Sequence, residues 1–274
     1  MENKDVSCFS CVLFDFILKR NQRLSDIDTL NKLTINSFVL AEVIYYKKVG
    51  KTIAEQPLRF LEISKEAESI NRLSSGDLNV FRMFGVDEKR HSYIIANLLN
   101  PLGEHGQKNL FLNIFLDMLK IERKSDNEIW VVTAEKGRID ILLKRVYPNH
   151  SVVVIENKSN YASDQTHQLY RYWYKEIYQT ICSKHLPNGY ILDPPSRFYQ
   201  LIYLSPSQWK IPSNNSLERP ENWDSRLPDR VPMVTNHLLF SVFIVNWLNA
   251  SLEKLPLDNH RIQEYVKQYI EFWT

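Results

Sequence analysis

The spacing of hydrophobic residues changes along the chain and divides it into a helical part and a mixed part. From Phe14 to Ile63 the apolar positions recur at intervals of three and four residues, which is the spacing of amphipathic helices. Pro57 and the polar run at 74–77 interrupt this pattern, and we expect joints between helices there. The pattern therefore predicts a helical extension over residues 1–80, followed by a separate domain over residues 81–274.

Two further helices and a group of strands are predicted in the second part. The segments DEKRHSYIIANLLN, which stops before Pro101, and NLFLNIFLDMLK have helical spacing. Three short runs rich in β-branched residues follow, IWVVTAE, RIDILLK and SVVVIEN, separated by Gly137 and by YPNH. Short apolar runs divided by turn residues are typical of neighbouring strands, so these three runs predict a β-meander.

The remaining elements complete an α/β pattern. We expect a helix over residues 162–182, a fourth strand over FYQLIYLSP, a long loop at 206–230 and a short strand at 231–235. Two closing helices are predicted to reach the C-terminus, and the first of them contains the apolar run LLFSVFIVNWL. That run is too short to cross a bilayer, so we interpret it as a buried helix.

Composition narrows the function without naming it. The chain has 274 residues, is 44% hydrophobic and carries a formal net charge of +2, so any contact with nucleic acid must come from a local basic patch. The chain has an odd number of cysteines, Cys8, Cys11 and Cys182, and no second C-x-x-C pair. This count argues against a disulfide framework and a structural zinc site. Asp15 interrupts the first apolar run, so we expect no signal peptide, no membrane partner and a cytoplasmic location.

Polar side chains lie inside two of the predicted strands. Asp140 falls within the second run, and Glu156 and Lys158 end the third. Glu156 and Lys158 are two residues apart and share a strand face, whereas Asn157 points to the other face. A buried carboxylate needs a partner, a proton or a metal ion. If the register brings Asp140 opposite Glu156, the two acids supply the oxygen ligands that Mg²⁺ prefers, and a lysine beside them suits water activation or phosphate binding.

The simpler interpretation is structural. In it, Asp140 bonds a backbone group, and Glu156 and Lys158 form an ordinary ion pair at a strand end. The helix that follows favours the functional interpretation, because Gln168 and Tyr172 are four residues apart and present an amide and a phenol on one face. That helix alone would also fit an amphipathic helix with a solvated face.

The order of these motifs resembles the PD-(D/E)XK nuclease superfamily. The resemblance rests on Ile139-Asp140, Glu156-Asn157-Lys158 and Gln168-x-x-x-Tyr172, and it covers about residues 87–205. The segment DEKRHSYIIANLLNPLGEHGQKNLFLNIFL is similar to one bacterial group of that superfamily, often uncharacterised or defence-associated. The resemblance implies an α/β restriction-endonuclease-like core, in which helices flank a mixed central sheet.

The resemblance also implies roles for individual residues. Asp140 and Glu156 would be metal ligands, Lys158 the catalytic lysine, and Glu88 a further metal or water contact. Gln168 and Tyr172 would act in the active site and orient the phosphate. Further substrate or phosphate contacts are expected from His91, Ser92, Arg171 and Lys175. The family's proline is replaced by Ile139, which removes no ligand.

The predicted function is that of a Mg²⁺-dependent nuclease, with Mn²⁺ expected to substitute. It would hydrolyse phosphodiester bonds, in DNA rather than RNA, with a role in antiphage defence. The alternative is a catalytically inactive nucleic-acid-binding or protein-interaction module on the same fold. A homodimer or a regulatory protein partner is expected to control such an enzyme.

Overall fold

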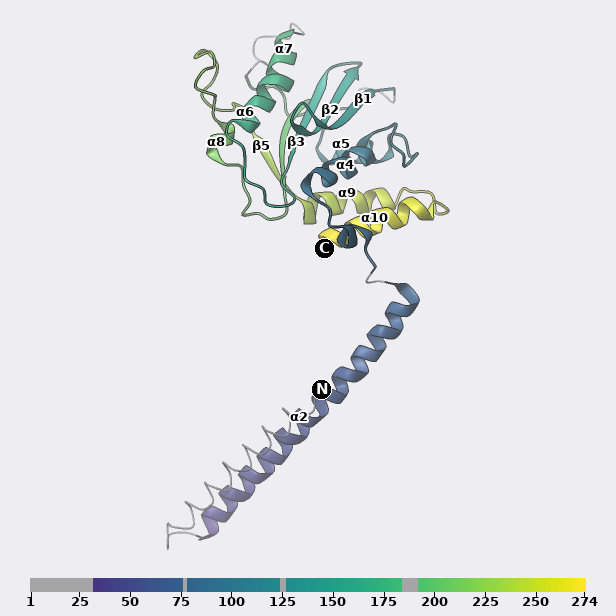
Figure 1. The fold of residues 1–274 in the computed structure, drawn as a ribbon, viewed down its shortest axis with the longest axis vertical. Coiled ribbons are helices and arrows are strands. Elements are labelled where there is room, and N and C mark those ends of the chain that lie inside the picture. Colours follow the sequence, from purple (N-terminus) through teal and green to yellow (C-terminus); the bar gives the residue numbers. More distant parts are fainter. Residues whose placement is uncertain (1–31, 76–77, 124–126, 184–191) are drawn as a thin grey trace. The chain divides into compact units, whose positions relative to one another are not determined.

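The computed structural model describes residues 32–75, 78–123, 127–183 and 192–274 (Figure 1). The chain divides between Asp77 and Leu78 into two compact units, which we describe separately. The expectations for residues 1–31, including Cys8 and Cys11, lie outside the described residues. No helix within the described part of the chain is long and apolar enough to cross a membrane.

The described part of the first unit is one long helix, α2 (Lys32–Ser74). The joint predicted at Pro57 is wrong, because α2 continues through this residue. A proline inside a helix removes one backbone hydrogen bond. Helical apolar spacing continues on both sides of Pro57, so the segments before and after it keep the helix. The helix ends at Ser74, where the polar run begins.

The second unit is built on a five-stranded mixed sheet with the strand order β1-β2-β3-β4-β5. The strands are β1 (Ile129–Lys136), β2 (Ile139–Tyr147), β3 (Ser151–Asn157), β4 (Tyr199–Ser205) and β5 (Thr235–Leu239). The first three are antiparallel, as a meander requires, while β3, β4 and β5 are parallel to one another. The predicted α/β class with a mixed sheet is therefore confirmed.

Two predicted boundaries are wrong. The strand predicted at 231–235 lies at Thr235–Leu239 instead. Pro232 has no N–H to donate to a neighbouring strand, which disfavours a strand over the predicted residues. The helix predicted from residue 162 begins at Gln168. Residues 162–167 form a loop, in which His167 has a left-handed backbone (φ 60°) and hydrogen bonds to the Glu218 carbonyl through its Nδ1, at 2.7 Å.

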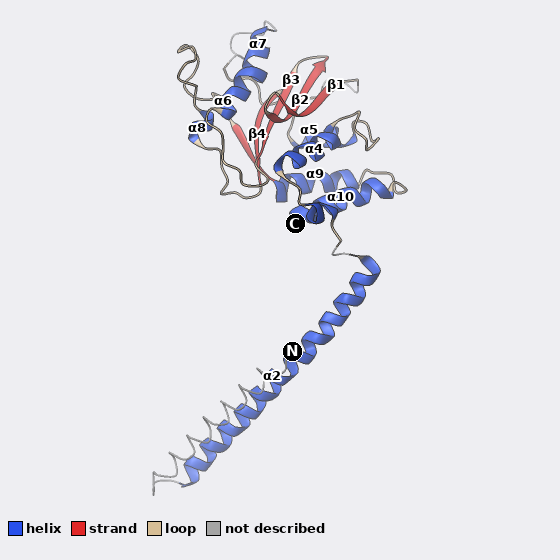
Figure 2. Cartoon of the chain, viewed as in Figure 1, coloured by secondary structure: helices blue, strands red, loops and turns tan. Residues whose placement is uncertain are grey.

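Helices cover both faces of the sheet (Figure 2). One face packs against α4 (Glu88–Leu99), α5 (Leu110–Met118), η3 (Phe240–Ile244), α9 (Val245–Leu252) and α10 (His260–Trp273), with α3 (Val80–Phe84) against α10. The other face carries α6 (Gln168–Tyr172), η1 (Trp173–Tyr178) and α7 (Gln179–Ser183), and α8 (Asn214–Leu217) lies in the predicted 206–230 loop against α6. Strand β3 is buried throughout because Val153 and Ile155 join the first core and Val152 and Val154 the second.

Burial of His91 on α4 predicts a pH dependence of stability. Its ring is fully buried among Phe272, Trp273 and Tyr269, with Nδ1 2.8 Å from the Tyr269 hydroxyl. Burial lowers the pKa of His91 to about 4, against a smaller opposing effect of Asp87. Between about pH 6.5 and about pH 4, His91 therefore binds a proton in the unfolded chain but stays neutral in the folded one. The free energy of unfolding is lost as the pH falls through this range.

We expect the free energy of unfolding to fall by about 2 kcal/mol more in the wild type than in His91→Gln between pH 7 and pH 5. Urea denaturation of both proteins at the two pH values measures this difference. Equal pH dependence of the two proteins would contradict the assignment of a neutral, buried imidazole.

Candidate active site

The two predicted metal-binding acids lie side by side on β2 and β3. Pairing of Ile141 with Ile155 sets the antiparallel register, and one step further along it Asp140 lies opposite Glu156. Asp140 accepts a hydrogen bond through Oδ2 from the backbone N–H of Asn157, at 2.6 Å. By strand alternation both carboxylates point towards the face that carries α6. The register on which the sequence interpretation depended is therefore present.

Lys158 completes this group at the end of β3. Its Nζ lies 2.5 Å from Oε1 of Glu156, and the two side chains are only 4% and 1% exposed. Burial alone would lower the pKa of Lys158, but the charge and hydrogen bond of Glu156, together with the charges of Glu88 and Asp140, outweigh it and the pKa is raised. The ammonium is therefore held in its charged form against a buried carboxylate.

Burial raises the pKa of both acids. It raises the pKa of Asp140 to about 8, and the neighbouring Glu156 adds to this effect. Burial also raises the pKa of Glu156, although Lys158 opposes the shift. Apart from the ion pair with Lys158, both carboxylate oxygens of Glu156 are buried without a hydrogen-bond partner among the described residues. When both acids are ionised, one ammonium balances only one of the two negative charges, so the group would attract a further cation.

This donor set fits a divalent cation of the Mg²⁺ type. Mg²⁺ is usually held by one or two carboxylates and keeps several waters. Asp140 and Glu156 supply the two carboxylates, although Oε1 of Glu156 already faces the Lys158 ammonium. No three Asp, Glu, His or Cys side chains converge on one metal position within the described ranges, so the remaining ligands would come from water or substrate.

Asn157, between the acid and the lysine, joins β3 to α4. It is fully buried on the opposite sheet face, and its Nδ2 donates to the Glu88 carbonyl at 2.7 Å and to Ser92 Oγ at 2.9 Å. Its Oδ1 accepts from the backbone N–H of Ser159 at 3.0 Å. The N-terminus of α4 is thereby fixed at the end of β3 that carries Lys158.

Residues 78–271 match the family model described as the PD-(D/E)XK nuclease superfamily. The chain belongs to this superfamily. No curated protein and no solved structure gives a significant match. Superfamily membership indicates a nuclease, hence a hydrolase with a nucleic-acid substrate, and members of the superfamily typically use a divalent metal.

In this PD-(D/E)XK protein, Glu88 opens α4 next to the acid pair. Burial raises its pKa, and Lys158 acts in the opposite direction, which places the two side chains within electrostatic reach of each other. Oε2 of Glu88 is buried without a hydrogen-bond partner in the described structure. Glu88 therefore lies near the site but not close enough to complete a cluster of three acids.

His91 and Ser92 lie on the same helix but face the core. His91 is enclosed by the aromatic residues described above, and Ser92 is fully buried with its hydroxyl bonded to the Glu88 carbonyl and to Asn157. This placement gives neither side chain access to a phosphate on the surface. Their contribution in this structure is to position α4 rather than to bind substrate directly.

The predicted pair on α6 lies next to Glu156. Gln168 Nε2 donates to the Tyr172 hydroxyl at 2.9 Å, and that hydroxyl donates to the Arg138 carbonyl. Gly137 and Arg138 form a two-residue hairpin turn with φ of 68° and 69°, as a type I′ turn requires. Burial and then the charge of Glu156 raise the pKa of Tyr172, so the phenol stays protonated. Tyr172 thus fixes α6 to the β1–β2 turn beside the acids.

Arg171 and Lys175 lie further from the acid pair. Arg171 uses Nη1 to donate to the Thr166 carbonyl at 2.8 Å. Lys175 is exposed above the β1–β2 turn, where its Nζ would lie 2.8 Å from a Cβ added at Gly137. The positive φ of Gly137 favours glycine at this position, whereas the flexible end of Lys175 could move away from a Cβ there. A phosphate contact of Arg171 or Lys175 remains a prediction.

Sequence reasoning missed Glu135. The register that pairs Ala134 with Ile141 and Lys136 with Ile139 leaves Glu135 beside Asp140. Its charge raises the pKa of both Asp140 and Glu88, and its backbone has a left-handed φ of 54°, which is uncommon for a residue other than glycine. Counting the hairpin register back from Gly137 would have found this fourth carboxylate.

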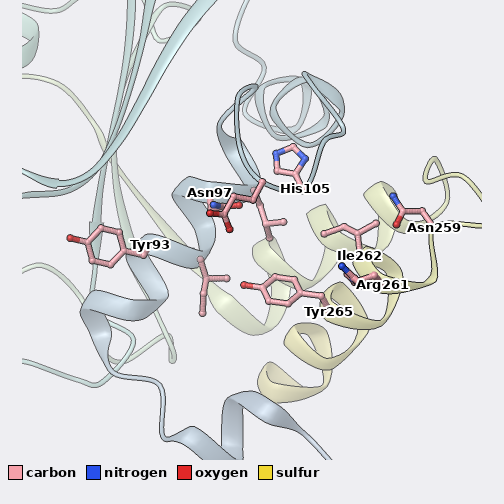
Figure 3. A pocket seen from close by; sticks show the side chains of 10 residues that line it. Tyr93, Asn97, His105, Asn259, Arg261, Ile262 and Tyr265 are labelled. Carbon is pink, nitrogen blue, oxygen red and sulfur yellow. The ribbon is translucent and has the colours of Figure 1, made fainter.

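A separate cavity of about 490 Å³ lies between α4 and α10 (Figure 3). Tyr93, Asn97, His105, Arg261 and Tyr265 line it, and none of Asp140, Glu156 and Lys158 does. Both ring nitrogens of His105 are engaged, Nε2 with the Asn100 carbonyl at 3.0 Å and Nδ1 with the Gln107 N–H at 3.0 Å. The cavity has no reactive group comparable to the acid pair, which stays the candidate active site.

The role of Asn157 can be tested by stability. Asn157→Ala removes three hydrogen bonds and leaves buried groups on α4 and Ser159 without a partner. We expect the free energy of unfolding to fall by about 2–3 kcal/mol, measured by urea denaturation. Asn160→Ala, at an exposed position in the same segment, is the control and should lie within about 0.5 kcal/mol of the wild type. Equal stability of the two variants would contradict the role given to Asn157.

Proposed function

We propose that this protein is a Mg²⁺-dependent nuclease that hydrolyses phosphodiester bonds, with DNA favoured over RNA and Mn²⁺ able to replace Mg²⁺. The observation that carries the proposal is the buried group of Asp140, Glu156 and Lys158, in which two acids lie opposite each other and one of them is paired with a buried ammonium. A structural ion pair would need one acid, whereas this site keeps a second one at the cost of burial.

Each residue of the site has a separate role in this proposal. Asp140 and Glu156 would hold the divalent cation, with Glu88 as a further contact through water. Such an ion, when bound, supplies Lewis acidity towards a phosphoryl oxygen and a neighbouring water. Lys158 would hold that water by a hydrogen bond or stabilise the negative charge that grows on a phosphate oxygen, because its ammonium is buried at the same point. Gln168 and Tyr172 hold the hairpin turn and the wall of the site in place.

The competing function is an inactive nucleic-acid-binding or protein-interaction module. Loss of activity on a nuclease fold usually removes an acid, because an unneeded buried carboxylate costs stability. Here the acids, the lysine, Gln168 and Tyr172 are all present and lie together. Calorimetric uptake of Mn²⁺ that disappears in Asp140→Ala favours the nuclease, and absence of uptake by the wild type favours the module.

Location and control belong to the same proposal. A cytoplasmic location is part of the proposal, because three cysteines without a second C-x-x-C pair do not suggest a disulfide framework. Helix α2 exposes apolar side chains, among them Phe60 at 72% and Ile63 at 58%, which a second copy or a regulatory protein would cover. A nuclease held in check by such a partner is compatible with a role in antiphage defence.

The direct test is cleavage of labelled single-stranded DNA, duplex DNA and RNA by the purified protein with Mg²⁺, Mn²⁺ or EDTA. We expect cutting with either metal and none with EDTA. Cutting that persists in EDTA would contradict the metal-dependent mechanism, and absence of both cutting and Mn²⁺ uptake would favour the inactive module.

A further inference from the structure

The loop that follows β4 lies beside the candidate active site. The backbone N–H of Lys158 donates to the Leu204 carbonyl at 2.9 Å, so the ends of β3 and β4 are adjacent. The chain leaves β4 at Ser205 and forms residues 206–213, which turn where the Lys210 N–H donates to the Ser207 carbonyl at 3.2 Å. The first residues of this loop therefore start next to the catalytic lysine.

Asp164 fastens this loop to the segment that follows β3. Its Oδ2 accepts from the Ser213 N–H at 2.6 Å, and its Oδ1 accepts from the Tyr203 hydroxyl at 2.8 Å. The Nζ of Lys210 lies 3.6 Å from the same Oδ1. Burial would raise the pKa of Asp164, but these partners outweigh it and the pKa is lowered. A charged Asp164 thus holds the segments 158–164 and 206–213 together.

Each of the two segments exposes one aromatic side chain. Trp209 is 83% exposed and Tyr161 is 60% exposed. Tryptophan is highly buried on average, so such exposure in a loop fixed by Asp164 is unusual. Tyr161 follows Lys158 in a tight turn, where its N–H donates to the Lys158 carbonyl at 3.0 Å and its φ is 59°. Neither ring is needed for the hydrogen bonds that shape its own segment.

One cation accompanies the two rings. Lys210 adjoins Trp209 in sequence, and its Nζ lies 3.6 Å from Oδ1 of Asp164 in the segment that follows Lys158. Proteins that bind single strands combine cations along the backbone with aromatic side chains on which unpaired bases stack. In an intact duplex the bases already stack on one another, and only groove edges and ends are accessible to a ring.

We propose that Trp209 and Tyr161 are a stacking surface for unpaired bases, so that the substrate of this site is single-stranded nucleic acid or an unpaired end. This inference rests on the proposed nuclease function, because it names the form of the strand that reaches Asp140, Glu156 and Lys158. The rings contribute to binding and positioning, and the acids and the lysine carry out the hydrolysis.

Binding without cleavage tests the inference. We would measure fluorescence anisotropy of a labelled oligothymidylate and of a blunt duplex of equal length, with Asp140→Ala in every protein to prevent cutting. Adding Trp209→Ala should raise Kd for the oligothymidylate about tenfold and change Kd for the duplex less than about twofold. Trp209→Phe keeps an aromatic face and should retain most of the affinity, and Tyr161→Ala should act in the same direction as Trp209→Ala.

Two controls separate stacking from other causes. Phe84→Ala removes a ring that is 70% exposed on α3, a helix that packs against α10, and should change neither Kd. The slope of log Kd against log salt should be the same with and without Trp209→Ala, because a neutral ring releases no counterions. Circular dichroism melting of each variant confirms that the loop change leaves the fold intact.

The outcomes distinguish this inference from the proposed function. Equal weakening on both probes, no weakening on the oligothymidylate, or no binding of the oligothymidylate would overturn the stacking surface. If the wild type cuts and Trp209→Ala keeps its preference between single strands and duplexes, the result contradicts the stacking surface and supports the nuclease function. If nothing is cut but binding depends on Trp209, the result contradicts the nuclease function and supports the single-strand binding site.

Discussion

Replacement of Asp140 by asparagine should lower kcat by about 10³-fold or more, while the protein stays folded. Asparagine has nearly the same shape and keeps an oxygen that can accept the hydrogen bond from the Asn157 N–H, now 2.6 Å long. It removes the negative charge that a divalent ion needs at this point, and such an ion typically supplies several kcal/mol of transition-state stabilisation. Cleavage rates at saturating substrate and calorimetric Mn²⁺ uptake should fall together.

Stability should respond to Asp140→Asn in the opposite direction. Because the pKa of Asp140 is raised to about 8 in the folded protein, its ionisation costs stability as the pH rises from about 4 to about 8. The variant should therefore melt at the same temperature as the wild type or higher at pH 8 in EDTA. Asp117→Asn, a change at an exposed carboxylate on α5, is the control for both measurements. A variant that unfolds, or one that cuts normally, would favour the structural ion pair instead.

Local periodicity was sufficient to predict the centre of the site. Alternation in β3 put Glu156 and Lys158 on one face and Asn157 on the other, and the structure shows both placements. The meander predicted from Gly137 and YPNH makes β2 and β3 antiparallel neighbours, which is what brings Asp140 opposite Glu156. Strand faces depend on residues two apart, so a short stretch of sequence determines them.

The surroundings of the site depend on contacts that local patterns do not contain. Asp164 binds Ser213 and Tyr203, about 40 to 50 positions along the chain, and these contacts bring the loop with Trp209 to the site. Asn157 looked like a spacer between two functional residues, yet it holds α4 through hydrogen bonds across 65 and 69 positions. Such pairings come from packing of the whole sheet, for which one sequence gives no spacing rule.

Replacement of Lys158 by methionine should also lower kcat by about 10²–10³-fold, with a different effect on stability. Methionine keeps most of the buried alkyl chain but leaves Glu156 without its counter-charge. Loss of one partner of a buried ion pair costs about 3–5 kcal/mol when the other stays ionised. Because burial raises the pKa of Glu156, the acid can take up a proton instead, so the loss of stability should be small at acidic pH and grow as the pH rises.

The double variant Glu156→Gln with Lys158→Met separates the two roles of this lysine. If the ammonium stabilises the fold only by neutralising Glu156, removal of both charges should restore most of the stability in EDTA, with a coupling energy of about 1–3 kcal/mol. Cleavage should not return, because both the ligand and the lysine are gone. Lys175→Met, at an exposed lysine, is the control. Melting curves and cleavage rates of the four proteins complete the cycle, and unchanged stability of Lys158→Met at pH 8 would contradict a charged, buried pair.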